Sequence, residues 1–182
     1  MAKAKSAYSE PPKTGKQDHH IIVVWVDNET GVLARVIGLF SGRGYNIESL
    51  AVAEVDKLKH LSRITIVSVG TPEVIEQIKL QLKKLLCVHK VADFNRSDPG
   101  ILFRELALFK IVSSTKNQEK VRKACKKYNL IVLDKTKKSF VIQITALRRE
   151  IDKLIKVIRP WGLVSISRTG AVAMTKGPEV FK

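Results

Sequence analysis

The sequence predicts an α+β protein made of two successive units, each with the order strand, helix, strand, strand, helix, strand. Short β-branched runs of strand length alternate with segments whose apolar residues recur at helical spacing. A turn-forming break, Ser97-Asp98-Pro99-Gly100, divides the chain. After this break the same order of elements begins again, although the sequence itself does not repeat.

The first unit opens on an apolar strand, Ile21 to Val26, followed by a turn over residues 27–31. Thr30 or Asn28 is expected to cap a helix that begins at Val32. The apolar residues at helical spacing predict its buried face, which is Leu33, Val36, Ile37 and Phe40. The helix is expected to end at Ser41-Gly42-Arg43-Gly44.

The rest of the first unit contains a hairpin, a second helix and a last strand. Strands are expected at 46–55 and 61–69, joined by a turn over 56–60. Thr71 and Pro72 begin the second helix. Its expected buried residues are Ile75, Ile78, Leu82 and Leu85, and a strand at 88–94 follows. This order is the ferredoxin-like split βαβ arrangement, which places both helices on one face of a four-stranded antiparallel sheet. The other face is left to solvent, a partner or a second copy.

The second unit is expected to repeat this ferredoxin-like topology. Its expected strands are 106–112, 130–133, 140–145 and 163–166, and its expected helices are 118–128 and 151–158. The apolar face of the first of these helices is Val121, Ala124 and Cys125. We therefore divide the chain into a disordered basic tail (1–19), a first domain (20–97), a second domain (98–177) and a short tail (178–182).

The positive charge is concentrated in the second half of the chain. Net charge is +16, of which +2 falls in residues 1–18, +1 in residues 19–98 and +13 in residues 99–182. A basic half-chain indicates either an acidic partner, such as nucleic acid, a phosphate ligand or an acidic protein face, or a lysine-rich solvated surface. RNA-recognition domains share this strand order, but they need aromatic residues on the central strands. Here those strands carry a single one, Phe109, which argues against that class.

Several other classes of function find no support in the sequence. No apolar run approaches the length of a membrane span, and no secretory signal is recognisable. The cysteines, Cys87 and Cys125, fit structural thiols of a reducing cytoplasm. A basic organelle-targeting segment at the start is the alternative location. The four histidines lack metal-ligand spacing, and no phosphate-binding motif or nucleophile elbow occurs, so we expect no catalytic residue, no metal and no cofactor in this chain.

The turn from residue 27 to residue 31 carries most of the functional information. The first N–H groups of the following helix lack intrahelical partners and attract a carboxylate. Gly31 removes a side chain where a ligand would approach, and Asn28 offers an amide donor and acceptor. Such a mixed site suits a free amino acid, which has an anionic and a cationic end. An ordinary capped turn is the other interpretation.

The segment from Asn28 to Leu50 strongly resembles the ACT domain, a ferredoxin-like module that binds small amino acids at dimer interfaces. Its Arg-Gly-Tyr-Asn-Ile-Glu-Ser-Leu block is specific, and the resemblance extends over about residues 20–177. More narrowly, the chain resembles the small regulatory subunits of acetolactate synthase (acetohydroxyacid synthase). The further blocks that carry this resemblance are Leu61 to Val67, Arg104 to Leu108 and Ser167-Arg168-Thr169-Gly170. Thr30 departs mildly from the family pattern, and the basic second half is unusual for it.

The resemblance implies a non-catalytic subunit that activates a large catalytic subunit and makes it sensitive to valine. That partner would hold thiamine diphosphate, magnesium and FAD. The implied effector site lies between two ACT domains of a homodimer. Its expected residues are Asn28, Gly31, Val32 and Leu33 of one chain and Asn46 and Ile47 of the other. The alternatives left open are an ACT-type sensor for another enzyme and, less favoured, a basic nucleic-acid-binding protein.

Overall fold

The computed structural model describes residues 17–95 and 98–178, and of Thr115 and Lys116 the backbone alone. It divides into two compact units. Unit 1 comprises the residues up to Leu102 together with those from Ala173 onward, and unit 2 comprises Phe103–Val172. Among the described residues no helix is long and apolar enough to cross a membrane. Most of the expected tails, 1–19 and 178–182, lies outside the described residues.

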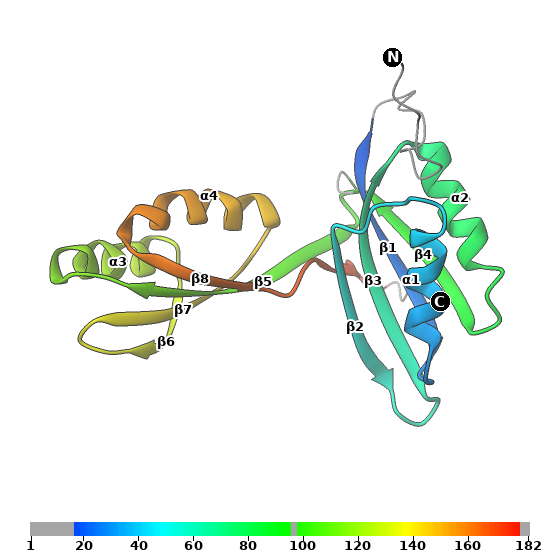
Figure 1. Cartoon of the computed structure of the whole chain (residues 1–182), viewed down its shortest axis with the longest axis horizontal. Coiled ribbons are helices and arrows are strands. Elements are labelled where there is room, and N and C mark those ends of the chain that lie inside the picture. Colours follow the sequence, from blue (N-terminus) through cyan, green and yellow to red (C-terminus); the bar gives the residue numbers. More distant parts are fainter. Residues whose placement is uncertain (1–16, 96–97, 179–182) are drawn as a thin grey trace, which may run out of the picture. The chain divides into compact units, whose positions relative to one another are not determined.

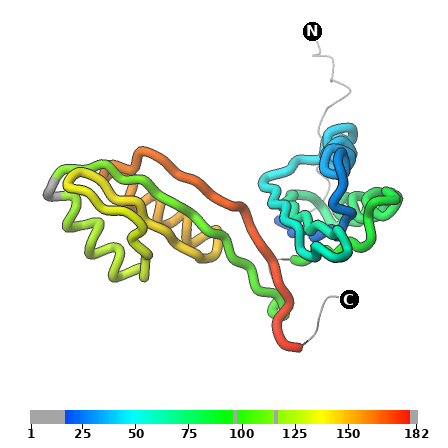
Figure 2. Tube along the Cα trace, turned by 90° about the horizontal axis from the view of Figure 1, so that it is seen from below, coloured from blue at the N-terminus to red at the C-terminus, as the bar shows by residue number. Residues whose placement is uncertain are grey.

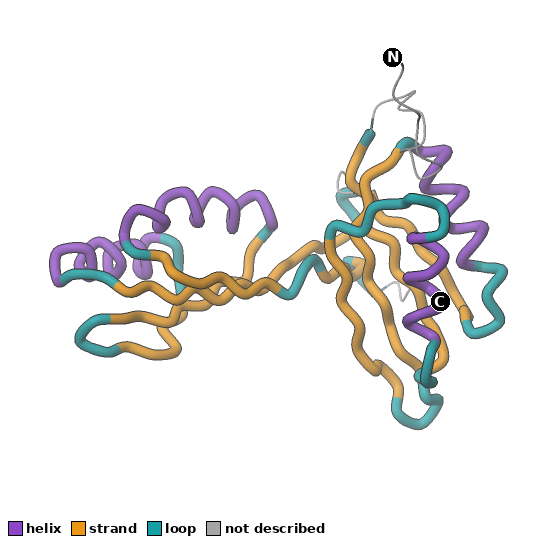
Figure 3. The backbone as a smooth tube through the Cα atoms, in the orientation of Figure 1, coloured by secondary structure: helices purple, strands orange, loops and turns teal. Residues whose placement is uncertain are grey.

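Unit 1 contains a four-stranded antiparallel sheet in the order β2-β3-β1-β4 (Figure 1). The strands are β1 (Asp18–Asp27), β2 (Ser49–Asp56), β3 (Leu61–Gly70) and β4 (Val88–Asn95). The helices are α1 (Val32–Ser41) and α2 (Pro72–Leu82), and both cover the same face of this sheet (Figure 3). This is the expected ferredoxin-like order.

The core of unit 1 lies between the sheet and its two helices. Alternate residues of a strand point to opposite faces, so one set from each strand reaches the helices. The fully buried members include Ile22, Val24, Ile64, Ile66, Val36, Phe40, Ile75, Ile78 and Leu82. The expected buried face of α2 is confirmed at Ile75, Ile78 and Leu82, whereas Leu85 is partly buried.

Helix α1 packs with a different face from the one that its spacing predicted. Val36 and Phe40 are buried as expected, but the remaining buried positions are Val32 and Leu39. Leu33 and Ile37, expected in the core, are 37% and 36% exposed. Because α1 is apolar on most of its surface, periodicity alone did not decide which residues face the sheet. The exposed pair leaves an apolar strip on its outer surface.

The face of the unit 1 sheet opposite the helices meets the C-terminal strand β9 (Val172–Thr175). Figure 2 shows this strand in red beside the start of β5 (Ile101–Val112) in green. The Lys176 N–H donates to the Gly100 carbonyl at 2.8 Å, and Ala173 is 4% exposed. Residues 173–177, which the sequence assigned to the second domain, thus pack with unit 1.

Unit 2 has the same topology, with its strands in the order β6-β7-β5-β8. Its elements after β5 are α3 (Thr115–Lys127), β6 (Ile131–Lys135), β7 (Ser139–Ala146), α4 (Arg148–Ile158), a 3₁₀ turn (Arg159–Trp161) and β8 (Leu163–Arg168). Val121, Ile151, Leu154 and Ile158 of the helices pack on Ala107, Phe109 and Ile111 of β5. Phe109 is completely buried and so is unavailable for base stacking.

The sharp turn before β8 depends on Gly162. Its φ is +99°, and a Cβ atom there would lie 2.0 Å from the Val112 carbonyl oxygen. The Val112 N–H in turn donates to the Gly162 carbonyl at 2.8 Å. A side chain at this position would therefore collide with backbone, and only glycine fits.

Candidate functional site

The turn between β1 and α1 is open at Gly31, the residue that precedes the helix. Gly31 has φ +85° and occupies the N-cap position, where no side chain bonds to the helix N-terminus. The expected capping by Thr30 or Asn28 is therefore wrong. A Cβ atom built on Gly31 would have no atom within 4 Å. The helix N-terminus is therefore uncapped, and Gly31, Leu33 and Ala34 are exposed there.

Several N–H groups at this turn are available for a ligand. The Val32 N–H, expected to be one of them, donates to the Glu29 carbonyl at 3.3 Å. No backbone carbonyl of the described residues accepts from the N–H groups of Gly31, Leu33 or Ala34. These three donors lie at the positive end of the α1 dipole, so the turn suits a carboxylate.

Asn28 is held in place from two neighbouring strands. Its N–H donates to the carbonyl of His60, in the β2–β3 turn, at 2.6 Å. Its side-chain Oδ1 accepts from the buried Ser62 hydroxyl at 3.0 Å, and its Nδ2 donates to Glu54 Oε1 at 3.1 Å. The Asn28 amide is therefore oriented by the protein itself before any ligand arrives.

The two halves of the predicted effector site lie far apart in a single chain. Asn28 is bonded to Ser62, whereas the Asn46 carbonyl accepts from the Ser68 hydroxyl at 2.8 Å. Ser62 and Ser68 are six residues apart on β3, a distance of roughly 20 Å. Asn46 is exposed, and Ile47 is partly buried against the core. One chain therefore does not bring Asn28 and Gly31 together with Asn46 and Ile47.

Three of the four histidines of unit 1 pair with carboxylates rather than with one another. His19 lies 3.1 Å from Glu48, and His89 lies 2.6 Å from Asp27. His20, which is buried, lies 3.0 Å from Asp93. Within residues 17–95 and 98–178 no group of three His, Cys, Asp or Glu side chains gathers as metal ligands would.

Sequence reasoning missed a cationic cluster on the face of the unit 1 sheet that is remote from the helices. The Arg63 guanidinium and the Lys90 ammonium lie 5.4 and 5.9 Å from the centroid of the Trp25 ring. Arg63 also donates to the Ala173 carbonyl of β9, and burial lowers the pKa of its guanidinium. The Leu61 to Val67 block thus contains both the Ser62 that orients Asn28 and the Arg63 that bonds β9.

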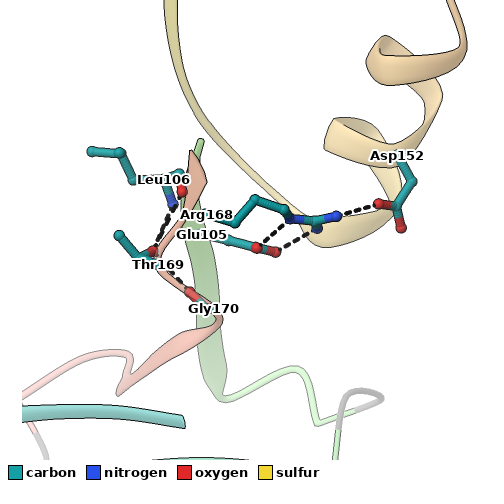
Figure 4. A network of polar contacts seen from close by, with 6 residues as sticks. All are labelled: Glu105, Leu106, Asp152, Arg168, Thr169 and Gly170. Atoms are coloured by element: carbon teal, nitrogen blue, oxygen red, sulfur yellow. Dashed lines mark hydrogen bonds and ion pairs between the residues drawn. The ribbon is translucent and has the colours of Figure 1, made fainter. Parts of the chain in front are cut away.

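A second missed network joins two of the sequence blocks within unit 2 (Figure 4). Arg168 binds the buried Glu105 carboxylate through two nitrogens and Asp152 through a third. These contacts raise the pKa of Arg168, mainly through the hydrogen bonds that it donates to the Glu105 carboxylate. Thr169 Oγ1 accepts from the Leu106 N–H at 3.2 Å. The blocks that begin at Arg104 and Ser167 are therefore adjacent and structural in role.

Comparisons with known proteins agree with this fold. A family described as "AHAS small subunit-like ACT domain" matches residues 22–90, and one described as "Small subunit of acetolactate synthase" matches residues 104–177. The fold, the open turn and the first match define the chain as an ACT-domain protein that carries a second ferredoxin-like unit.

Relatives that align over most of their own length identify the family of the chain more narrowly. The acetolactate synthase small subunit of Aquifex aeolicus is 38% identical over 90% of this chain and 84% of its own length. The isozyme 3 small subunit of Escherichia coli is 36% identical over 89% of this chain and 98% of its own. The crystal structure of the Thermotoga maritima small subunit superposes with a TM-score of 0.81, at 30% identity, over 88% of this chain and 99% of that one. The chain belongs to the family of acetolactate synthase small subunits.

Proposed function

We propose that this chain is the regulatory subunit of an acetolactate synthase in branched-chain amino-acid biosynthesis. It performs no chemistry itself. It binds and activates a large catalytic subunit in the cytoplasm, and that partner holds thiamine diphosphate, magnesium and FAD. Binding of valine to the small subunit imposes feedback inhibition on the complex. Membership of the small-subunit family supports the partnership, and the site geometry supports the sensing role.

The observation that carries the sensing role is the open turn at Gly31. An uncapped helix N-terminus with three available N–H groups offers a carboxylate both hydrogen bonds and a favourable dipole. The oriented Asn28 amide beside it offers a polar group for the other end of an amino acid. In this proposal the effector carboxylate accepts from the N–H groups of Gly31, Leu33 and Ala34 rather than from that of Val32, which already donates to the Glu29 carbonyl.

The effector site is completed by a second copy of the chain. Asn46 and Ile47 lie at the opposite end of the sheet from Gly31, so a two-fold arrangement is needed to bring them to the turn of a partner. The exposed Leu33 and Ile37 provide an apolar surface on α1 for such a contact. Strand β2 is an edge strand with a further two exposed valines, Val52 and Val55.

In this mechanism valine stabilises one arrangement of the small-subunit dimer, and the catalytic subunit prefers another. A coupling free energy of about 1–3 kcal/mol would change the activity five- to roughly a hundredfold. The isopropyl group of valine would contact Ile47. Leucine and isoleucine, the other candidate effectors, each have one methylene more than valine. Such a difference is worth about 1–3 kcal/mol in an apolar pocket, so the affinity must be measured for all three amino acids.

Two measurements test the proposal. The tagged chain should co-purify with a large thiamine-diphosphate enzyme that forms acetolactate, and adding the chain to that enzyme should raise its activity. Calorimetric titration should then show a branched-chain amino acid binding to the small subunit. Failure to associate with such an enzyme would overturn the partnership, and the absence of binding by any of the three amino acids would overturn the sensing role.

A further inference from the structure

The effector site needs a group that binds the ammonium end of an amino acid. An amino acid carries its ammonium and carboxylate on one carbon, so this group must lie beside the turn that takes the carboxylate. A buried or half-buried ammonium requires an oppositely charged acceptor, because a neutral amide compensates its loss of water poorly. A carboxylate near Asn28 would meet this requirement.

Four acidic residues lie at this end of unit 1: Asp27, Glu29, Glu54 and Asp56. Two of them are already occupied. Asp27 pairs with His89 at 2.6 Å. Asp56 accepts from the N–H groups of Leu58 and Lys59 at 3.0 and 3.1 Å, which holds the β2–β3 turn. Glu29 and Glu54 remain.

Of these two carboxylates, that of Glu54 is already oriented by a hydrogen bond. Its Oε1 accepts from Asn28 Nδ2 at 3.1 Å, and no described residue donates to its Oε2. A carboxylate has about four acceptor positions, so most of its capacity is available. The exposed side chain of Glu29 makes no hydrogen bond or ion pair with the described residues, and it would lose more conformational freedom on binding a ligand.

We propose that Glu54 binds the ammonium group of the effector and thereby restricts the site to 2-amino acids. This inference rests on the proposed function of the Gly31 turn. Asn28 and Glu54 together present an acceptor-rich surface next to the N–H donors of α1. A 2-oxo acid or a simple carboxylic acid with the same side chain would place its carboxylate near an uncompensated Glu54 and would be rejected.

The variant Glu54→Gln tests this by removing the charge while keeping an oxygen that accepts from Asn28. Calorimetry on the full chain would compare three ligands: valine, 3-methylbutanoate, which is valine without its amino group, and the corresponding 2-oxo acid. We expect valine to bind about tenfold or more weakly to the variant, because a charge-assisted hydrogen bond is lost. The two ligands without an ammonium group should bind the variant at least as well as they bind the unmodified chain.

Glu29→Gln is the matched control, since it removes one negative charge from the same turn. It should leave the valine affinity within about twofold. An unchanged valine affinity in Glu54→Gln, an equal loss for valine and 3-methylbutanoate, or a tenfold loss in Glu29→Gln alone would each overturn the role of Glu54. If the unmodified chain binds none of the branched-chain amino acids, the proposed sensing function falls first, and this role falls with it.

Discussion

Arg168 and Glu105 form a two-point ion pair between strands β8 and β5. The Nε–Oε1 and Nη2–Oε2 distances are 2.6 and 2.8 Å, and the Glu105 side chain is 4% exposed. The third nitrogen of Arg168 reaches Asp152 on α4 at 2.7 Å. One guanidinium therefore connects two strands and a helix of unit 2, and a buried carboxylate depends on it.

Replacing Arg168 with alanine should strongly destabilise unit 2. The buried Glu105 would lose its counter-charge, which costs about 3 kcal/mol or more. Asp152→Asn is the control: its carboxylate is 47% exposed, so the loss should be below about 1 kcal/mol. Urea unfolding followed by Trp161 fluorescence in a Trp25→Phe background reports on unit 2 alone, since the chain has two tryptophans. Equal losses in the two variants would contradict this assignment.

Gly31→Asp should abolish sensitivity to branched-chain amino acids while activation of the catalytic subunit survives. The introduced carboxylate would lie at the N–H groups that take the effector carboxylate and would repel it. Gly31→Asn is the control, because Asn has a similar size and tolerates the same positive φ without the charge. The readout is acetolactate formation across an effector titration. Full retention of sensitivity in Gly31→Asp would place the effector elsewhere.

Gly162→Ala should destabilise unit 2 by about 3 kcal/mol or more, because the added methyl group would overlap the Val112 backbone at a left-handed φ. Gly38→Ala is the opposite case. Gly38 lies inside α1 with open space around it, so alanine should stabilise unit 1 by about 0.5–1 kcal/mol. Thermal or denaturant unfolding of the two variants should give changes of opposite sign.

Arg63→Ala should loosen the C-terminal strand of unit 1. Arg63 donates to the Ala173 carbonyl, and the neighbouring Lys176 N–H donates to Gly100. We expect the Lys176 amide to exchange with deuterium about tenfold faster in the variant, which corresponds to about 1.4 kcal/mol of lost local stability. Lys59→Ala, at an exposed side chain of the β2–β3 turn, should leave this rate unchanged.

The Cys125 thiol should react slowly with alkylating agents near pH 8. Burial raises the pKa of this thiol, so its thiolate is rarer than that of an ordinary cysteine. The neutral thiol therefore contributes stability that is present below the unfolded pKa and is lost as the pH rises through the higher folded pKa. Iodoacetamide labelling of the native and the urea-unfolded chain at pH 8, resolved by peptide mass, measures the difference.

Local patterns predicted the topology of both units but not the orientation of α1. Strand and helix order follows from periodicity and turn residues, which act over a few positions. Helix α1 has apolar residues on most sides, and the packing of Val32 and Leu39 against the sheet decided its orientation. Its outward pair, Leu33 and Ile37, is therefore a feature that required the structure.

The candidate site was predicted in part. Asn28 and Gly31 follow from the strand-turn-helix pattern, because one residue lacks a side chain and the other is a short amide. The roles of Glu54, Ser62 and Arg63 depend on contacts with residues 26 to 110 positions away, which no local pattern contains. Strand β9 was missed because four residues, Val-Ala-Met-Thr, carry too little periodicity to predict an element.

The return of β9 to unit 1 has a consequence during synthesis of the chain. Arg63 and Ala173, which are hydrogen-bonded, are 110 residues apart, and the whole of unit 2 is translated between them. At about 5–20 residues per second the ribosome needs roughly 5–20 seconds to cover this interval. During that time the nascent first domain lacks β9, and the Arg63 guanidinium remains without the Ala173 carbonyl that it later bonds.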